Sequence, residues 1–93
     1  MATVFVRIKW TNYDEVIEVF ANHADVRQSY GSQGATVFRN AEDPDEAMIL
    51  FEWDDPANMK AFFDDPEVQA VIRPGAVAPP QVFVASGAED FNA

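Results

Sequence analysis

The sequence predicts an α+β protein with the ferredoxin-like order βαββαβ and a four-stranded antiparallel sheet. Two observations carry this prediction. Short runs of alternating apolar and polar residues, rich in β-branched and aromatic side chains, are interleaved with segments of helical periodicity. The chain has only 93 residues, of which 48% are hydrophobic, so it has room for a single small core. We therefore expect one domain over residues 1–84 and a C-terminal tail over residues 85–93.

The first half of the chain predicts a strand, a long helix and a second strand. Residues 3–10 alternate as a half-buried strand does. Asn12 is suited to cap a helix over residues 13–30, whose apolar residues fall on one stripe. Gly31 is placed to end that helix in a left-handed conformation, and the second strand is expected over residues 35–40.

The second half repeats the pattern with a divided helical region. Residues 46–53 form the most hydrophobic run and predict a central strand. The Asp-Pro pairs at 55–56 and 65–66 each place a capping carboxylate before a proline, which predicts helices through Phe63 and Ile72. Residues 81–84 follow two prolines and are expected as a strand at the sheet edge.

Both faces of the predicted sheet carry apolar residues. We place Phe5 and Val37 on one face, and Val6 and Ile49 on the other. Two helices can cover only one of these faces, so a second sheet is needed for the other, and a homodimer is its simplest source. The fold prediction thus includes dimerisation into an α/β barrel.

Composition limits the partners and the compartment. Sixteen acids against six bases give a formal charge of −10, which repels nucleic acid and anionic membrane surfaces. The chain has no cysteine and no apolar run long enough for a membrane span, so we expect a cytoplasmic protein. An acidic, lysine-poor surface is also typical of a halophilic source, because high salt screens its self-repulsion. The halophile reading is a hypothesis.

Two polar residues interrupt the apolar stripe of the first helix. His23 and, one turn later, Arg27 stand where aliphatic side chains are expected. An inward imidazole and guanidinium are costly unless a polar group meets them. The alternatives are a core histidine that donates to a sheet carbonyl or to a tyrosine, and an arginine paired with a carboxylate such as Glu52 or Asp25. Arg7 and Glu52 lie on faces that adjoin if the first and third strands pair, and we expect them, with Arg39 and Lys9, to form an ion-pair layer at the dimer interface.

These motifs, in this order, resemble a known family. The segments HADVRQSYGSQGATVFRNAEDPDEAMILFEWDD and FFDDPEVQAVIRPGAVAPPQVF resemble small dimeric α/β-barrel proteins related to antibiotic biosynthesis monooxygenases, many of them uncharacterised. The resemblance implies a small-molecule pocket between sheet and helices, with His23 and Arg27 facing it. It also implies a cofactor-independent oxidoreductase that acts on a small aromatic or polyketide-like compound.

On that reading, His23 is the candidate base and Arg27 stabilises the substrate anion. The expected substrate-binding walls are Phe20, Tyr30, Trp53 and Phe38. A single histidine with scattered acids has no metal-ligand spacing, and no flavin or nicotinamide motif is present, so we expect no metal and no cofactor. The alternative function is a non-catalytic small-ligand-binding or structural homodimer of the same fold.

Overall fold

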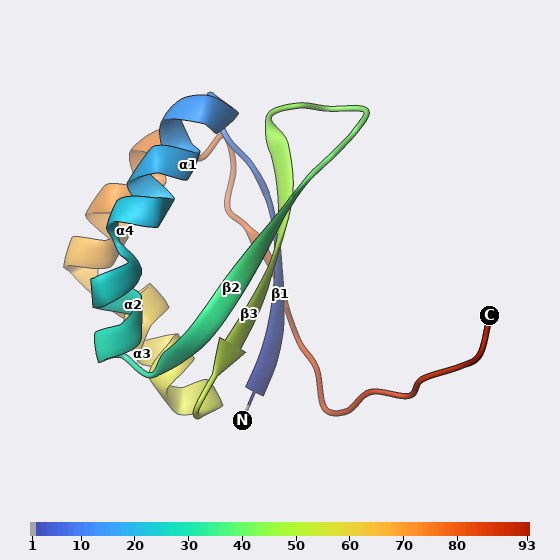
Figure 1. Ribbon diagram of the computed structural model, residues 1–93. Helices are drawn as coiled ribbons and strands as arrows, with labels where there is room; N and C mark the ends of the chain where they lie inside the picture. The colour runs from blue at the N-terminus through green and yellow to red at the C-terminus, as the bar shows by residue number, and fades with distance from the viewer. Residues whose placement is uncertain (1) are drawn as a thin grey trace.

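The computed structural model describes residues 2–93 and has the predicted ferredoxin-like α+β fold. Its strands form one antiparallel sheet in the order β2-β3-β1-β4, and α1 to α4 all lie on one side of it (Figure 1). The elements along the chain are β1 (Ala2–Lys9), α1 (Tyr13–Asn22), α2 (Ala24–Ser29), β2 (Ser32–Arg39), β3 (Glu46–Trp53), α3 (Pro56–Asp64), α4 (Pro66–Ile72), the 3₁₀ turn η1 (Arg73–Gly75) and β4 (Gln81–Val84).

The helix expected over residues 13–30 is instead two helices that meet at His23. The backbone of His23 has φ −106° and ψ 18°, outside the helical region. Its N–H bonds to the carbonyl of Phe20, three residues back, which tightens the last turn of α1. Asn22 and His23 are both weak helix formers, so propensity favours a break here although the apolar stripe continues across it. The second strand also begins earlier than expected, at Ser32. Its pairing with β3 shifts register between Ser32 and Gly34.

The predicted helix ends are present at the expected residues. The side chain of Asn12 accepts from the N–H of Glu15, and those of Asp55 and Asp65 cap α3 and α4 in the same way. Gly31 ends α2 with a φ of 99°. A Cβ at this position would lie 2.2 Å from a carboxylate oxygen of Asp54, so only glycine fits without movement.

The core lies between the sheet and the helices. Alternation along β1 turns Val4, Val6 and Ile8 inward, where they pack on alternate residues of β3 and on α3 and α4. Val37 also faces the helices, because the strand register places it beside Ile49, which in turn lies beside Val6. Our assignment of Val37 to the same face as Phe5 was therefore wrong, since the register between strands cannot be read from one strand's alternation.

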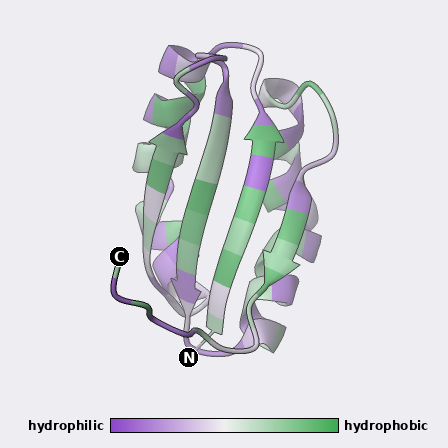
Figure 2. Ribbon diagram, turned by 90° about the vertical axis from the view of Figure 1, so that its right-hand side faces the viewer, coloured by the Kyte–Doolittle hydropathy of each residue, from purple (hydrophilic) through white to green (hydrophobic). Residues whose placement is uncertain are grey.

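No helix covers the other side of the sheet in this single chain (Figure 2). We call it the open sheet face, and it comprises Phe5, Phe38, Met48, Leu50 and Phe83 with the polar residues between them. The exposed fraction is 54% for Phe38, 41% for Met48 and 65% for Phe83. Beyond Val84 the chain forms no further helix or strand and leaves on this side (Figures 1 and 2). Within residues 2–93, no helix has the length and apolar character of a membrane span.

Candidate functional site

A cavity of about 300 Å³ lies between the sheet and the two pairs of helices. We call it the helix–sheet cavity. This volume is at the lower end of the range found for small-molecule sites. The cavity is lined mainly by aliphatic and aromatic side chains, and its polar residues are few: His23, Arg27, Asp65 and Glu67. An apolar hollow with a few polar groups is suited to a small organic ligand that carries one polar end.

His23 is held at the cavity by the break in the helix. Its Nδ1 lies 2.6 Å from the carbonyl oxygen of Val19. A carbonyl oxygen can only accept, so Nδ1 carries the hydrogen and the neutral imidazole has its lone pair on Nε2. With Nδ1 so occupied, Nε2 is the nitrogen available to accept a proton from a ligand.

Arg27 is fixed in two ways by a single residue. Its Nη1 donates to the backbone carbonyl of Phe20, and its guanidinium carbon lies 3.9 Å from the centre of the Phe20 ring. Burial lowers the pKa of Arg27 because it penalises the charged form. Among residues 2–93 the guanidinium forms no ion pair, so Glu52 and Asp25 are not its partners. The carboxylate of Glu52 instead accepts from the hydroxyl of Thr3.

The same contacts have a structural consequence. The carbonyls of Val19 and Phe20 belong to the last turn of α1, where backbone donors become few, although the Phe20 carbonyl also accepts from the N–H of His23. The imidazole of His23 and the guanidinium of Arg27 supply hydrogen bonds to these two carbonyls. Both side chains therefore stabilise the end of α1, and each keeps further nitrogen atoms for other partners.

The four residues expected to bind the substrate do not lie together. Phe20 lines the helix–sheet cavity, whereas Tyr30, Trp53 and Phe38 do not. Trp53 is fully buried and packs against Phe62, with ring centres 5.4 Å apart. Phe38 lies on the open sheet face, opposite the cavity, because side chains alternate along β2. The structure thus brings together His23, Arg27 and Phe20 only.

Two acidic residues of the cavity wall were not anticipated as site residues. Asp65 and Glu67 come from the start of α4, which faces α2 across the cavity. One oxygen of Asp65 accepts from the N–H of Glu67 and the other from the hydroxyl of Tyr30. The Asp-Pro motif in the sequence indicates a helix cap, but it does not indicate that Asp65 lines a cavity.

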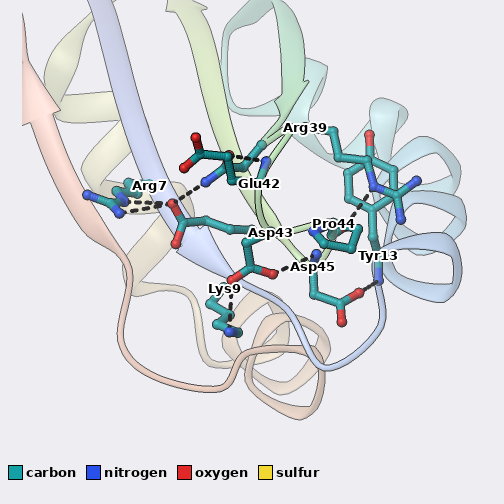
Figure 3. A network of polar contacts seen from close by, with 10 residues as sticks. Arg7, Lys9, Tyr13, Arg39, Glu42, Asp43, Pro44 and Asp45 are labelled. Atoms are coloured by element: carbon teal, nitrogen blue, oxygen red, sulfur yellow. Dashed lines mark hydrogen bonds and ion pairs between the residues drawn. The ribbon is translucent and has the colours of Figure 1, made fainter.

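Arg7 and Glu52 do not adjoin within the chain, although the expected ion-pair layer assumed that they do. Arg7 pairs with Glu46 at 2.9 Å, and Lys9 pairs with Asp43 at 2.8 Å. The strand register explains the difference, because Glu52 lies beside Thr3, four residues and about 13 Å along β1 from Arg7. These contacts form part of a polar network around the β2–β3 turn (Figure 3).

Arg39 joins the same network from β2. Its guanidinium carbon lies 4.1 Å from the centre of the Tyr13 ring, and its Nε donates to the carbonyl of Pro44 (Figure 3). The network therefore connects the β2–β3 turn to the start of α1. It does not include His23. In the described part of the chain, no group of three or more potential metal ligands is found.

The Tyr30–Asp65 bond predicts a pH-dependent contribution to stability. The hydroxyl of Tyr30 lowers the pKa of Asp65 below 3.8, and Asp65 raises the pKa of Tyr30 above 10.0. The stabilisation is therefore complete between these values, and it is lost as the pH falls through the lowered pKa or rises through the raised one. We expect Tyr30→Phe to lower the free energy of unfolding near neutral pH and to have little effect at strongly acidic pH. Urea unfolding of both proteins across the acid range tests this, and a difference that persists below the titration of Asp65 would contradict it.

Comparison with known proteins identifies a family match and several similar structures. The family model of antibiotic biosynthesis monooxygenases matches residues 1–74. SnoaB, a cofactor-independent oxygenase from Streptomyces nogalater, has a similar crystal structure, with a TM-score of 0.72, 17% identity and coverage of 94% of each chain. A candidate antibiotic biosynthesis monooxygenase from Chloroflexus aurantiacus has a TM-score of 0.67 and 24% identity, with 98% of each chain covered.

A third similar structure comes from Bordetella bronchiseptica. It is also a candidate antibiotic biosynthesis monooxygenase, with a TM-score of 0.74 and 15% identity over 95% of this chain and 97% of that one. At these identities the three structures establish a shared fold, and a search of curated proteins gave no match. The family model covers most of the sequence, and the chain therefore belongs to the antibiotic biosynthesis monooxygenase family.

Proposed function

We propose that this protein is a cofactor-independent oxygenase that acts on a small hydroxyarene bound in the helix–sheet cavity. The observation that carries the proposal is the pairing of two groups at one apolar cavity. The Nδ1 of His23 is bonded to the carbonyl of Val19, which leaves Nε2 as the ring nitrogen for a ligand, and Arg27 presents a cation that no carboxylate in residues 2–93 neutralises. A base and a fixed cation together are what formation of a phenolate requires.

The reaction that fits these groups has a simple balance. Nε2 of His23 takes the hydroxyl proton, and Arg27 stabilises the resulting phenolate. The para carbon of this anion then supplies electrons to O₂ and forms a carbon–oxygen bond. The terminal peroxide oxygen takes the proton back from the imidazolium, the para C–H proton is lost, and the oxygen–oxygen bond breaks. For a phenol such as 1-naphthol, one hydroxyarene and one O₂ give one quinone and one water.

Oxygen consumption with 1-naphthol tests this proposal. We expect the protein to consume one O₂ per quinone formed, and to place one atom of labelled O₂ in the quinone, above the rate without protein. Quinone absorbance and an oxygen electrode provide the two readings. Binding of 1-naphthol without any oxygen consumption would contradict the oxygenase and would leave a ligand-binding protein.

The second candidate is a non-catalytic ligand-binding or structural homodimer. The observation in its favour is that His23 and Arg27 both donate to carbonyls at the end of α1. If this were their whole role, side chains that keep those hydrogen bonds would preserve every property of the protein. The two candidates therefore differ in what His23 does besides capping.

We further propose that the open sheet face is covered by a second copy of the chain, which closes an α/β barrel. Phe83 and Phe5 stack at 6.2 Å on this face, and Phe38 and Met48 extend the same apolar surface on β2 and β3. Exposed apolar patches of this kind in soluble proteins mark interaction sites. A copy with the same face is self-complementary by symmetry.

We expect Phe83→Lys to weaken dimerisation about 30-fold or more, because a charge is then placed among apolar groups. Val77→Lys is the control, since Val77 is also exposed and lies in the loop before β4. Sedimentation equilibrium of the three proteins gives the dissociation constants. A monomeric parent protein, or a Phe83→Lys protein that dimerises as well as the parent, would contradict the proposed interface.

A further inference from the structure

Arg27 differs from the three basic residues that form ion pairs in the described chain. Arg7, Lys9 and Arg39 are more exposed and each pairs with a carboxylate. Arg27 is half-buried at an apolar cavity and pairs with none among residues 2–93, although the chain has 16 acids. A half-buried cation without an anion is unfavourable, so its presence needs a reason.

The acids on the cavity wall do not provide that anion. Both oxygens of Asp65 already accept hydrogen bonds, from the N–H of Glu67 and from the hydroxyl of Tyr30. The side chain of Glu67 is exposed and forms no ion pair in the described chain. Neither carboxylate is therefore paired with Arg27, although both line the same cavity.

The donors of Arg27 are also only partly used. One nitrogen donates to Phe20, and the ring of Phe20 holds one face of the guanidinium. A guanidinium has five N–H groups, so most of them remain for a ligand, beside Nε2 of His23. An anionic oxygen is the partner that such donors bind most strongly.

We propose that the helix–sheet cavity holds its ligand as an organic oxyanion, either a carboxylate or the ionised form of a phenol or enol, attached to a compact apolar body. The inference rests on the proposed function in taking this cavity as the ligand site, and it narrows the ligand to organic acids whose ionised form Arg27 stabilises. The apolar body occupies the cavity between β1, β3 and the helices. The negative surface of the protein disfavours the approach of anions, so binding of the ligand depends on its contact with Arg27.

A matched pair of probes tests the charge preference without any turnover. 2-Naphthoate is anionic at neutral pH, 2-naphthamide is a neutral molecule of nearly the same shape, and neither has a hydroxyl to be oxidised. Calorimetric titration of the parent protein is expected to show naphthoate binding about 10-fold or more tightly than naphthamide. Arg27→Gln is expected to abolish the preference, Arg27→Lys to retain part of it, and Arg73→Gln, which alters an exposed arginine bonded to Gln69, to leave it unchanged.

A phenol tests whether the site binds phenolates as well as carboxylates. 4-Nitrophenol changes its absorbance on ionisation, so its pKa can be read in the bound state. A lower pKa for bound nitrophenol in the parent protein, restored in Arg27→Gln, assigns the site to phenolates as well as carboxylates. An unchanged nitrophenol pKa together with a naphthoate preference restricts the site to carboxylates. The other titratable groups that face this site are His23, Asp65 and Glu67. The absorbance of bound nitrophenol is therefore recorded over a wide pH range in the parent protein and in Arg27→Gln.

The result that overturns the inference is the absence of a charge preference. An unshifted nitrophenol pKa together with either equal binding of naphthoate and naphthamide or no binding of either would do so even if Arg27→Gln did not fold. The oxygenase can fail separately. Loss of oxygen consumption with an intact naphthoate preference would remove the proposed reaction and leave the oxyanion site in place.

Discussion

Replacing His23 by asparagine is expected to lower turnover of 1-naphthol about 100-fold or more, while the free energy of unfolding stays close to that of the parent protein. The amide nitrogen of asparagine takes the place of Nδ1 and can donate to the carbonyl of Val19. Asparagine has no atom in the place of Nε2, so the proposed base is removed. General-base catalysis contributes about 100-fold to 10,000-fold in rate, which sets the expected loss.

His23→Ala is the comparison that separates the two roles of the imidazole. Alanine removes both the hydrogen bond to Val19 and the base, so we expect the same loss of turnover with an additional loss of about 1 kcal/mol in stability. Turnover follows from oxygen consumption, and stability from urea unfolding. An asparagine variant that retains parent turnover would exclude His23 as the base. It would favour the non-catalytic function, in which the histidine only caps α1.

The order and type of the elements could be read from the sequence because each has a local signature. Alternation identified β1 and β3, and Asp-Pro pairs set the start of α3 and α4 at Pro56 and Pro66. The break at His23 could not be read in this way. The apolar stripe favours one long helix, and the side-chain contacts that stabilise a break appear only in three dimensions.

The candidate site could be predicted only where its residues share one helical face. Phe20, His23 and Arg27 are spaced three and four residues apart, and they are brought together by helix periodicity alone. Asp65 reaches the same cavity from α4, far along the chain, so only the packing of α4 opposite α2 reveals it. Trp53 and Phe38 have suitable aromatic chemistry, but strand register and helix packing direct one into the core and the other to the open sheet face.

The fully buried position of Trp53 leads to the largest expected loss of stability. Its ring packs against Phe51 and Phe62, with centres 6.1 Å and 5.4 Å away. Trp53→Ala leaves a large void in this aromatic cluster, and we expect it to lower the free energy of unfolding by about 3–5 kcal/mol. Urea unfolding monitored by circular dichroism measures this change.

Trp53→Phe is the informative partner of that variant. The indole Nε1 of Trp53 is buried and has no hydrogen-bond partner among residues 2–93, and an unpaired buried donor costs about 1–3 kcal/mol. Phenylalanine removes this donor and keeps most of the ring contacts, so the gain offsets part of the lost volume and the net change is expected to be small. Because Trp53 does not line the helix–sheet cavity, 2-naphthoate affinity should also be unchanged in this variant. A large loss of affinity at unchanged stability would mean that the indole N–H is a ligand contact, and would make Trp53 the substrate-binding residue that the sequence predicted.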